Sequence, residues 1–207
     1  MPAAWRWVHA APLEGEALLR HGLPRLQLGV GKTRASFELT RALVSEPGAG
    51  VVVVGVCGAF RGRGLAIGDI CVVAQDREID EGVQTPAGFL DLQALGLTAP
   101  CEARADEAMT ARAAATLACP AVAGVTVSTC SGTDALAAAR ARSGAAIETM
   151  EGAAIAWVCA ELGVPWIAVR AVSNYTGDRD RAGWDLRRAM VALGGAVDRL
   201  VAAGVCT

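Results

Sequence analysis

The sequence is poor in lysine and histidine, and its arginines are scattered along the chain. Lys32 is the only lysine among 207 residues, and the formal net charge is −2. Proteins whose main partner is a nucleic acid or an anionic membrane usually gather their cations into a stripe or patch. No such cluster is present, so the composition argues against both kinds of partner.

The usual patterns of metal ligands are missing as well. The seven cysteines form no C-x-x-C pair, and His9 and His21 are the only histidines. Zinc sites are commonly built from closely spaced cysteine and histidine ligands, so we expect no metal site. An odd number of scattered cysteines favours buried free thiols in a reducing compartment, and we predict a cytoplasmic location.

The sequence also lacks the apolar runs that are typical of a signal peptide or a membrane span. The stretch MPAAWRWVHAAPLEGEALL has no basic segment followed by an apolar core, so we expect no signal peptide. Residues 113–133 are uncharged, but Pro120, Gly124 and several hydroxyls predict a helix end and a buried strand there. With 53% hydrophobic and 19% charged residues, we expect one globular domain over residues 1–207.

The motif Gly31-Lys32-Thr33 has the ending of a phosphate-binding P-loop. A P-loop requires G-x-x-x-x-G-K-[ST], which places its first glycine at position 26, and that residue is Leu26. The pattern therefore fails. A glycine turn that opens a helix can still hold an anion or a polar ligand against the backbone, although this signal is weak by itself.

Apolar runs alternate with helical patterns along the chain, which predicts an α/β domain with helices on both faces of a sheet. We expect strands over residues 51–60, 68–75, 121–130 and 165–173, and helices over 105–118, 133–141, 151–163 and 183–204. The helix over 151–163 looks amphipathic, and Gly194-Gly195 could interrupt the last helix. Residues 76–101 are the least regular and are expected to form a long excursion over the surface.

Ligands of open α/β sheets lie beyond the carboxyl ends of the strands. The informative residues are therefore those that follow each apolar run: Glu14, Gly29 to Gly31, Cys57-Gly58, Ser128 to Ser131, Met150-Glu151, and Arg170 to Tyr175.

The most distinctive segment is ETMEGAAIAWVCAELGVPWIAVRAVSNYTGDRD, residues 148–180. It resembles the purine nucleoside phosphorylase and nucleosidase superfamily, in which MEG or MEA opens a helix and R-A-[IV]-S-[DN] follows the next strand. The GVGK turn and the stretch GVCGAFRGRGLAIGDICVV, a G-x-x-G hairpin in that superfamily, fit the same resemblance. It implies a three-layer α/β/α sandwich around a central mixed β-sheet.

Within that superfamily, three stretches resemble the futalosine hydrolase family: APLEGEALL, EGVQTPAGF and SNYTGDRDRAGW. The resemblance covers nearly the whole chain, in order. It implies an N-ribosyl hydrolase that cleaves futalosine to hypoxanthine and dehypoxanthine futalosine, a step of menaquinone biosynthesis, without a metal or organic cofactor. It also implies a homodimer or higher homo-oligomer.

The resemblance assigns roles to the residues at the sugar. Glu14 would activate the attacking water, as a positioned base does, with Glu16 as the rival because the register around LEGE is loose. Glu151 would accept hydrogen bonds from the ribose hydroxyls, and Met150 would pack under the sugar. Glu14 and Glu151 also have a structural interpretation as helix N-terminal acids, and Met150 as a core residue.

Arg170 would lie near the water and Glu14, unless it forms a structural salt bridge. The related nucleosidases carry G-S-A-G-G where this chain has Gly55-Val56-Cys57-Gly58-Ala59, so Cys57 and Gly58 are candidate substrate contacts. The hydroxyl of the serine is missing here. One arginine without that hydroxyl offers few groups that could bind a phosphate dianion, which favours hydrolysis over phosphorolysis.

At the base, Asn174 stands where adenine-releasing nucleosidases have an aspartic acid that protonates the leaving group. An amide cannot give up a proton at neutral pH, but it can donate a hydrogen bond to a 6-oxopurine. Cys130 lies in STCSGT, where the superfamily contacts the purine. The structural alternatives are a turn residue for Asn174 and a buried small residue for Cys130.

Two other functions stay open from the sequence. One is a methylthioadenosine or S-adenosylhomocysteine nucleosidase, which an aspartic acid at position 174 would have favoured. The other is a nucleoside-binding protein of the same fold without activity, against which the presence of Glu14, Glu151 and Arg170 argues.

Overall fold

The computed structural model describes residues 4–98, 101–178 and 183–206. The strands are β1 (Trp5–His9), β2 (Arg25–Gln27), β3 (Gly50–Ala59), β4 (Ile70–Glu78), β5 (Gly82–Thr85), β6 (Gly88–Asp91), β7 (Glu102–Arg104), β8 (Ala121–Thr126), β9 (Ile147–Thr149) and β10 (Trp166–Tyr175). The helices are the short 3-10 helix η1 (Pro12–Gly15) and α1 (Glu16–Leu19), α2 (Lys32–Ser45), α3 (Glu107–Leu117), α4 (Asp134–Ala141), α5 (Gly152–Glu161) and α6 (Leu186–Ala202).

Local sequence explains several helix boundaries. The Asp106 carboxylate accepts the backbone N–H of Met109 at 2.8 Å and caps α3, and the Thr133 hydroxyl caps α4 in the same way. Gly163 adopts a left-handed φ of 65° directly beyond α5, which ends that helix as its position before Pro165 predicts.

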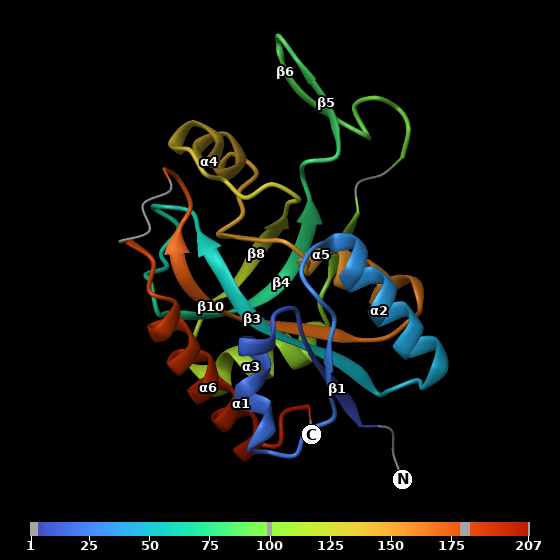
Figure 1. Ribbon diagram of the computed structural model, residues 1–207. Coiled ribbons are helices and arrows are strands. Elements are labelled where there is room, and N and C mark those ends of the chain that lie inside the picture. Colours follow the sequence, from blue (N-terminus) through green and yellow to red (C-terminus); the bar gives the residue numbers. More distant parts are fainter. Residues whose placement is uncertain (1–3, 99–100, 179–182, 207) are drawn as a thin grey trace.

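Most strands belong to one mixed sheet, and part of it closes on itself. Strands β2, β1, β3 and β10 run parallel to one another, whereas β4 is antiparallel to β10. The pairing continues from β4 through β8 and β9 and returns to β3, so five strands form a closed ring of pairings. β5 and β6 form a separate hairpin that stands away from the rest of the molecule (Figure 1).

Helices cover both faces of this sheet, which confirms the three-layer α/β/α architecture (Figure 1). Alternate valines of β3 point to opposite layers: Val51 and Val53 pack with α2 and α5, and Val52 and Val54 pack with α1, α3 and α6. A strand buried on both faces therefore requires a continuous apolar run, as the sequence of β3 has.

Four expectations from the sequence need correction. The stretch expected to be least regular, residues 76–101, contains the end of β4 and the β5–β6 hairpin; its residues 99–100 lie outside the described part of the chain. β3 and β4 do not form a hairpin, because β10 lies between them. Helix α6 runs through Gly194-Gly195 without a break, because neighbouring residues on both sides are packed against the sheet. Helix α5 is buried nearly all round rather than amphipathic; Trp157 is its main exposed apolar residue.

Among the described residues, no helix has the length and apolar character needed to cross a membrane.

Candidate active site

The carboxyl ends of β1, β3 and β10 lie at the same edge of the sheet because these strands are parallel. The chain leaves β1 through η1, which carries Glu14. The N-termini of α2 and α5 reach the same place, since Gly31, the N-cap of α2, contacts Glu151, the N-cap of α5. Five segments distant in sequence therefore converge at this edge.

The carboxylate of Glu14 is fixed by three backbone hydrogen bonds. Its Oε2 accepts the backbone N–H groups of Ala10 at 3.1 Å and Ala11 at 2.8 Å, and its Oε1 accepts that of Val56 at 2.9 Å. The residue is 6% exposed, whereas Glu16 is exposed. Of the two candidate bases, only Glu14 therefore has a carboxylate fixed inside the site.

Arg170 approaches Glu14 across Gly55 of β3. A Cβ atom on Gly55 would lie 2.5 Å from Arg170 Nη1 and 2.6 Å from Glu14 Oε1, so only glycine leaves room for both side chains. Arg170 is 2% exposed, and its Nε and Nη2 have no hydrogen-bond partner among the described residues. A buried guanidinium with unpaired donors beside a carboxylate is a ready site for a water molecule or a substrate oxygen.

Glu151, the N-cap residue of α5, lies within electrostatic range of both Arg170 and Glu14. Its Oε1 accepts the backbone N–H of Gly31 at 2.8 Å, and it makes no side-chain cap of α5. Burial raises the pKa of Glu151, and the neighbouring Glu14 adds to this, while the Gly31 hydrogen bond and Arg170 lower it in part. The glycine turn of GVGK thus holds a carboxylate of the same chain.

Asn174 lies on β10, four residues beyond Arg170, and is paired with Gly58 of β3. A Cβ on Gly58 would lie 3.3 Å from Asn174 Nδ2, so the amide lies directly against this glycine. Asn174 Nδ2 donates to the carbonyl of Tyr175 at 3.0 Å, and the Ser173 hydroxyl lies 2.8 Å from Asn174 Oδ1. These contacts fix the amide plane and use one of its two N–H bonds.

The remaining predicted residues occupy different surroundings. Cys57 is 3% exposed, and its thiol faces the carbonyl of Ala171 in the core at 3.7 Å, so its side chain does not line the edge. Met150 is half-buried between β9 and α5, next to Glu151. Cys130 is exposed on the loop between β8 and α4.

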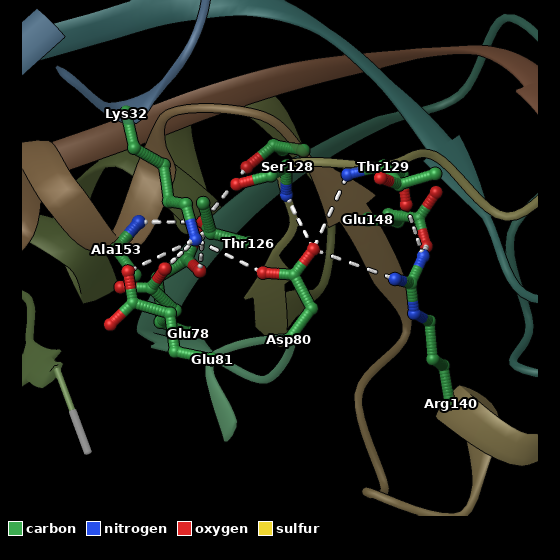
Figure 2. A network of polar contacts seen from close by, with 12 residues as sticks. Lys32, Glu78, Asp80, Glu81, Thr126, Ser128, Thr129, Arg140, Glu148 and Ala153 are labelled. Carbon is green, nitrogen blue, oxygen red and sulfur yellow. Dashed lines mark hydrogen bonds and ion pairs between the residues drawn. The ribbon is translucent and has the colours of Figure 1, made fainter. Parts of the chain in front are cut away.

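A network of charges holds that loop (Figure 2). The ammonium of Lys32 contacts Glu78, Asp80 at 3.0 Å and Glu81 at 3.7 Å. Asp80 Oδ2 accepts the backbone N–H groups of Ser128 at 2.6 Å and Thr129 at 3.3 Å. The only lysine is therefore surrounded by carboxylates, which is the opposite of a phosphate-binding environment.

Arg140 of α4 continues the network on the far side of the loop (Figure 2). It pairs with Glu148 at 3.2 Å and Asp80 at 3.5 Å, and it donates to the carbonyl of Thr129 at 2.6 Å. Glu148 also accepts the backbone N–H of Ser131 at 2.7 Å. The loop that carries Cys130 is thus fixed from both sides by buried or half-buried ions.

One buried acid near the site escaped the sequence analysis. Asp76 of β4 is 1% exposed, and burial raises its pKa to about 7, while the hydrogen bond from Thr126 and the charge of Arg170 act in the opposite direction. Gly55 was also missed as a site residue. A glycine inside an otherwise β-branched strand is a signal of close approach, and it could have been found. Asp76 gives no such signal, because only tertiary packing brings it to Glu151.

The candidate site at this edge of the sheet contains two sets of functional groups. Glu14 and Arg170 can hold and deprotonate a water molecule, and Glu151 beside them can accept hydrogen bonds from hydroxyl groups. Further along β10, Asn174 presents an amide donor. The part of the chain that the structure describes contains no cluster of histidine, cysteine and carboxylate ligands for a metal ion.

Comparison with known proteins gives consistent results. The family model of the phosphorylase superfamily matches residues 15–202. A futalosine hydrolase of Thermus thermophilus is 36% identical over 189 residues, which cover 87% of this chain and 82% of the relative. A futalosine hydrolase of Streptomyces coelicolor is 36% identical over 196 residues, which cover 88% and 80% of the two chains.

Solved structures confirm the fold. The futalosine hydrolase of Helicobacter pylori superposes with a TM-score of 0.82 at 16% identity, covering 96% of this chain and 97% of that one. The methylthioadenosine/S-adenosylhomocysteine nucleosidase of the same organism gives 0.83 at 16% identity, with 98% and 99% covered. At such low identity, these likenesses speak for the fold alone, whereas the sequence relatives also identify the family. The chain belongs to the phosphorylase superfamily and, within it, to the futalosine hydrolase family.

Proposed function

We propose that this protein hydrolyses the N-glycosidic bond of futalosine and releases hypoxanthine and dehypoxanthine futalosine, a step of menaquinone biosynthesis. The observation that carries the proposal is the pair formed by Glu14 and Arg170 across Gly55, inside a chain whose relatives are futalosine hydrolases. A fixed, buried carboxylate beside unpaired guanidinium donors is suited to activating water.

In this mechanism, Glu14 accepts a proton from the attacking water, and Arg170 orients that water through its free N–H groups. Glu151 accepts hydrogen bonds from the vicinal ribose hydroxyls, and Met150 packs beneath the sugar. The transition state carries positive charge on the ribose and negative charge on the leaving base. Preoriented carboxylates stabilise the first of these charges without reorganising.

Asn174 donates a hydrogen bond to the leaving base at the other end of the site. Gly58 allows the base to approach β3 closely, Cys57 contributes through its backbone, and Cys130 lies on the loop that covers the purine. The support for this assignment is the second N–H bond of the Asn174 amide, which no other described residue accepts, and the place of this amide against Gly58.

Water rather than phosphate is the proposed nucleophile. Val56 offers no hydroxyl, and its backbone N–H is already used by Glu14. Arg170 is enclosed by carboxylates, because Glu14, Glu151 and Asp76 all lie near it. The carboxylates among them that are ionised would repel a phosphate dianion.

We also propose a cytoplasmic homodimer that needs no cofactor. The seven cysteines are free thiols, as expected for a reducing compartment. The β5–β6 hairpin exposes Val83, Phe89 and Leu90, and an isolated two-stranded hairpin is only marginally stable in water. A second copy that covers these side chains would stabilise the hairpin.

The decisive experiment is an assay for free base with futalosine, inosine and methylthioadenosine, each with and without phosphate. We expect release of hypoxanthine from futalosine at a rate that does not depend on phosphate. A strict phosphate requirement would make the protein a phosphorylase, faster release of adenine would make it a methylthioadenosine nucleosidase, and no release at all would leave a binding protein.

Asn174 tests the choice of leaving group. We expect Asn174→Ala to lower kcat/KM for futalosine about ten- to a hundredfold, because a lost hydrogen bond to a developing charge is worth about 1–3 kcal/mol. Asn174→Asp should also lose futalosine turnover, since an ionised carboxylate would repel the oxygen of a 6-oxopurine. If Asn174→Asp cleaves futalosine as fast as the wild type, Asn174 does not face the base.

A further inference from the structure

Asp76 belongs to a buried polar chain that ends at the first turn of α5. Its Oδ1 accepts the hydroxyl of Thr126 at 2.8 Å, and Thr126 Oγ1 in turn accepts the backbone N–H of Ala153 at 2.7 Å. The hydroxyl of Thr149 lies 3.2 Å from that of Thr126 and accepts the backbone N–H of Gly152 at 3.2 Å. Asp76 is the final acceptor of this chain.

This arrangement satisfies the first N–H groups of α5 without using the side chain of its N-cap residue. An acidic N-cap ordinarily accepts such N–H groups with its own carboxylate. Here Thr126 and Thr149 accept them, and Glu151 makes no side-chain cap. The carboxylate of Glu151 is thereby free to turn toward Gly31 and the site.

The side chain of Asp76 also explains the glycine that follows Glu151. A Cβ on Gly152 would lie 2.0 Å from Asp76 Oδ2 and 2.9 Å from Thr149 Oγ1. Gly152 is not among the glycines with positive φ, so its backbone would accept an L-residue. Space taken by the Asp76 carboxylate, and not backbone conformation, requires glycine at position 152.

We propose that Asp76 is a positioning residue for the sugar end of the active site. It occupies the space beside Gly152 and terminates the threonine chain, so that the turn over residues 150–152 presents the Glu151 carboxylate to the substrate. This inference rests on the proposed function, because it assumes that Glu151 binds the ribose hydroxyls.

The test is a double-mutant cycle of Asp76→Ala and Gly152→Ala, measured as kcat and KM with futalosine and as Tm. Gly152→Ala alone should raise KM by about tenfold or more, because its methyl group displaces the turn that carries Glu151. In the Asp76→Ala background, the severe contact with Asp76 Oδ2 is gone, and only the milder contact with Thr149 Oγ1 at 2.9 Å remains. The second substitution should then change KM by less than about threefold.

Asp76→Asn serves as the conservative variant, because its Oδ1 can still accept the Thr126 hydroxyl. We expect its KM to stay within about threefold of the wild type, and that of Asp76→Ala to rise by about tenfold. A purely structural role would lower the amount of folded enzyme and hence kcat, with KM unchanged.

The inference would be overturned if Gly152→Ala had the same effect in both backgrounds, or if the variants changed kcat alone. In that case the proposed function would still stand, provided that the wild type cleaves futalosine. If the wild type cleaves no nucleoside, the proposed function fails first, and the positioning role falls with it.

Discussion

At the scale of single residues, the site is a compact set of buried charges with an excess of acid. Glu14, Glu151 and Asp76 are each at most 6% exposed, and Arg170 is the buried cation near them. Burial raises the pKa of Glu151 and of Asp76, and a neighbouring carboxylate adds to the shift in each case. A substrate that spreads positive charge over its sugar in the transition state would relieve this repulsion.

Glu14→Gln tests the proposed base at this scale. We expect kcat to fall by about two to four orders of magnitude, because an amide cannot accept the proton from water. The amide NH₂ of glutamine is a donor and would face at least one of the three backbone N–H groups that now donate to the carboxylate, so Tm should fall slightly. Steady-state kinetics with futalosine and thermal unfolding measure both effects.

Glu16→Gln is the matched control, because the same substitution is made two residues away on an exposed side chain. It should leave kcat and KM within about twofold of the wild type. If Glu16→Gln were the inactive variant and Glu14→Gln an active one, the roles of the two residues would have to be exchanged.

At the scale of elements, the β5–β6 hairpin stands apart from the main sheet of the described chain. It pairs with no other strand of the described residues, and Figure 1 shows it projecting beyond the sheet. Its apolar side chains Val83, Phe89 and Leu90 are 42–47% exposed. A hairpin of this kind gains stability when another surface covers it.

Phe89→Asp tests the proposed contact between two copies. A carboxylate in an apolar interface is desolvated without a partner, so we expect the dimer to dissociate at least tenfold more readily. Analytical ultracentrifugation over a range of concentrations measures the change. Val191→Asp on α6, where the side chain is 72% exposed, is the control and should leave the dimer intact. A wild-type protein that sediments as a monomer would refute the proposal.

At the scale of the whole molecule, Asp76 makes stability depend on pH. Its pKa is raised from 3.8 to about 7 in the folded protein, so between these values the folded state binds more protons than the unfolded state. The free energy of unfolding therefore falls as pH rises from about 4 to about 7, and it is level above that range. At about 1.4 kcal/mol per pKa unit, the loss is on the order of 4 kcal/mol.

Asp76→Asn should remove this contribution, since an amide does not titrate. We expect the stability of Asp76→Asn relative to the wild type to increase steadily between pH 4 and pH 7. Urea unfolding of both proteins at several pH values measures the difference. Parallel stability curves over this range would show that Asp76 is ionised in the folded protein and would contradict the raised pKa.

Much of the layered architecture could be predicted from the sequence. The valine run of β3 determines a strand buried on both faces, and the periodic helices between strands determine that both faces are covered. The motif MEG placed Glu151 just beyond a strand, as the structure does, because local patterns mark where a strand stops. The motif RAVSN placed Arg170 near a strand end, but Arg170 lies in the middle of β10. These two side chains and that of Glu14 are buried, and their catalytic roles stay predictions.

Tertiary structure decided the pairing of the strands and the partners of each charge. Nothing in the sequence places β10 between β3 and β4, because strand order depends on packing between segments that lie far apart along the chain. The same packing brings Asp76 under Gly152 and sets Arg170 against Glu14 across Gly55. The sequence by itself determined which residues we propose for the chemistry, whereas only the fold decided which of them meet, since electrostatic and steric contacts depend on distance in space and not along the chain.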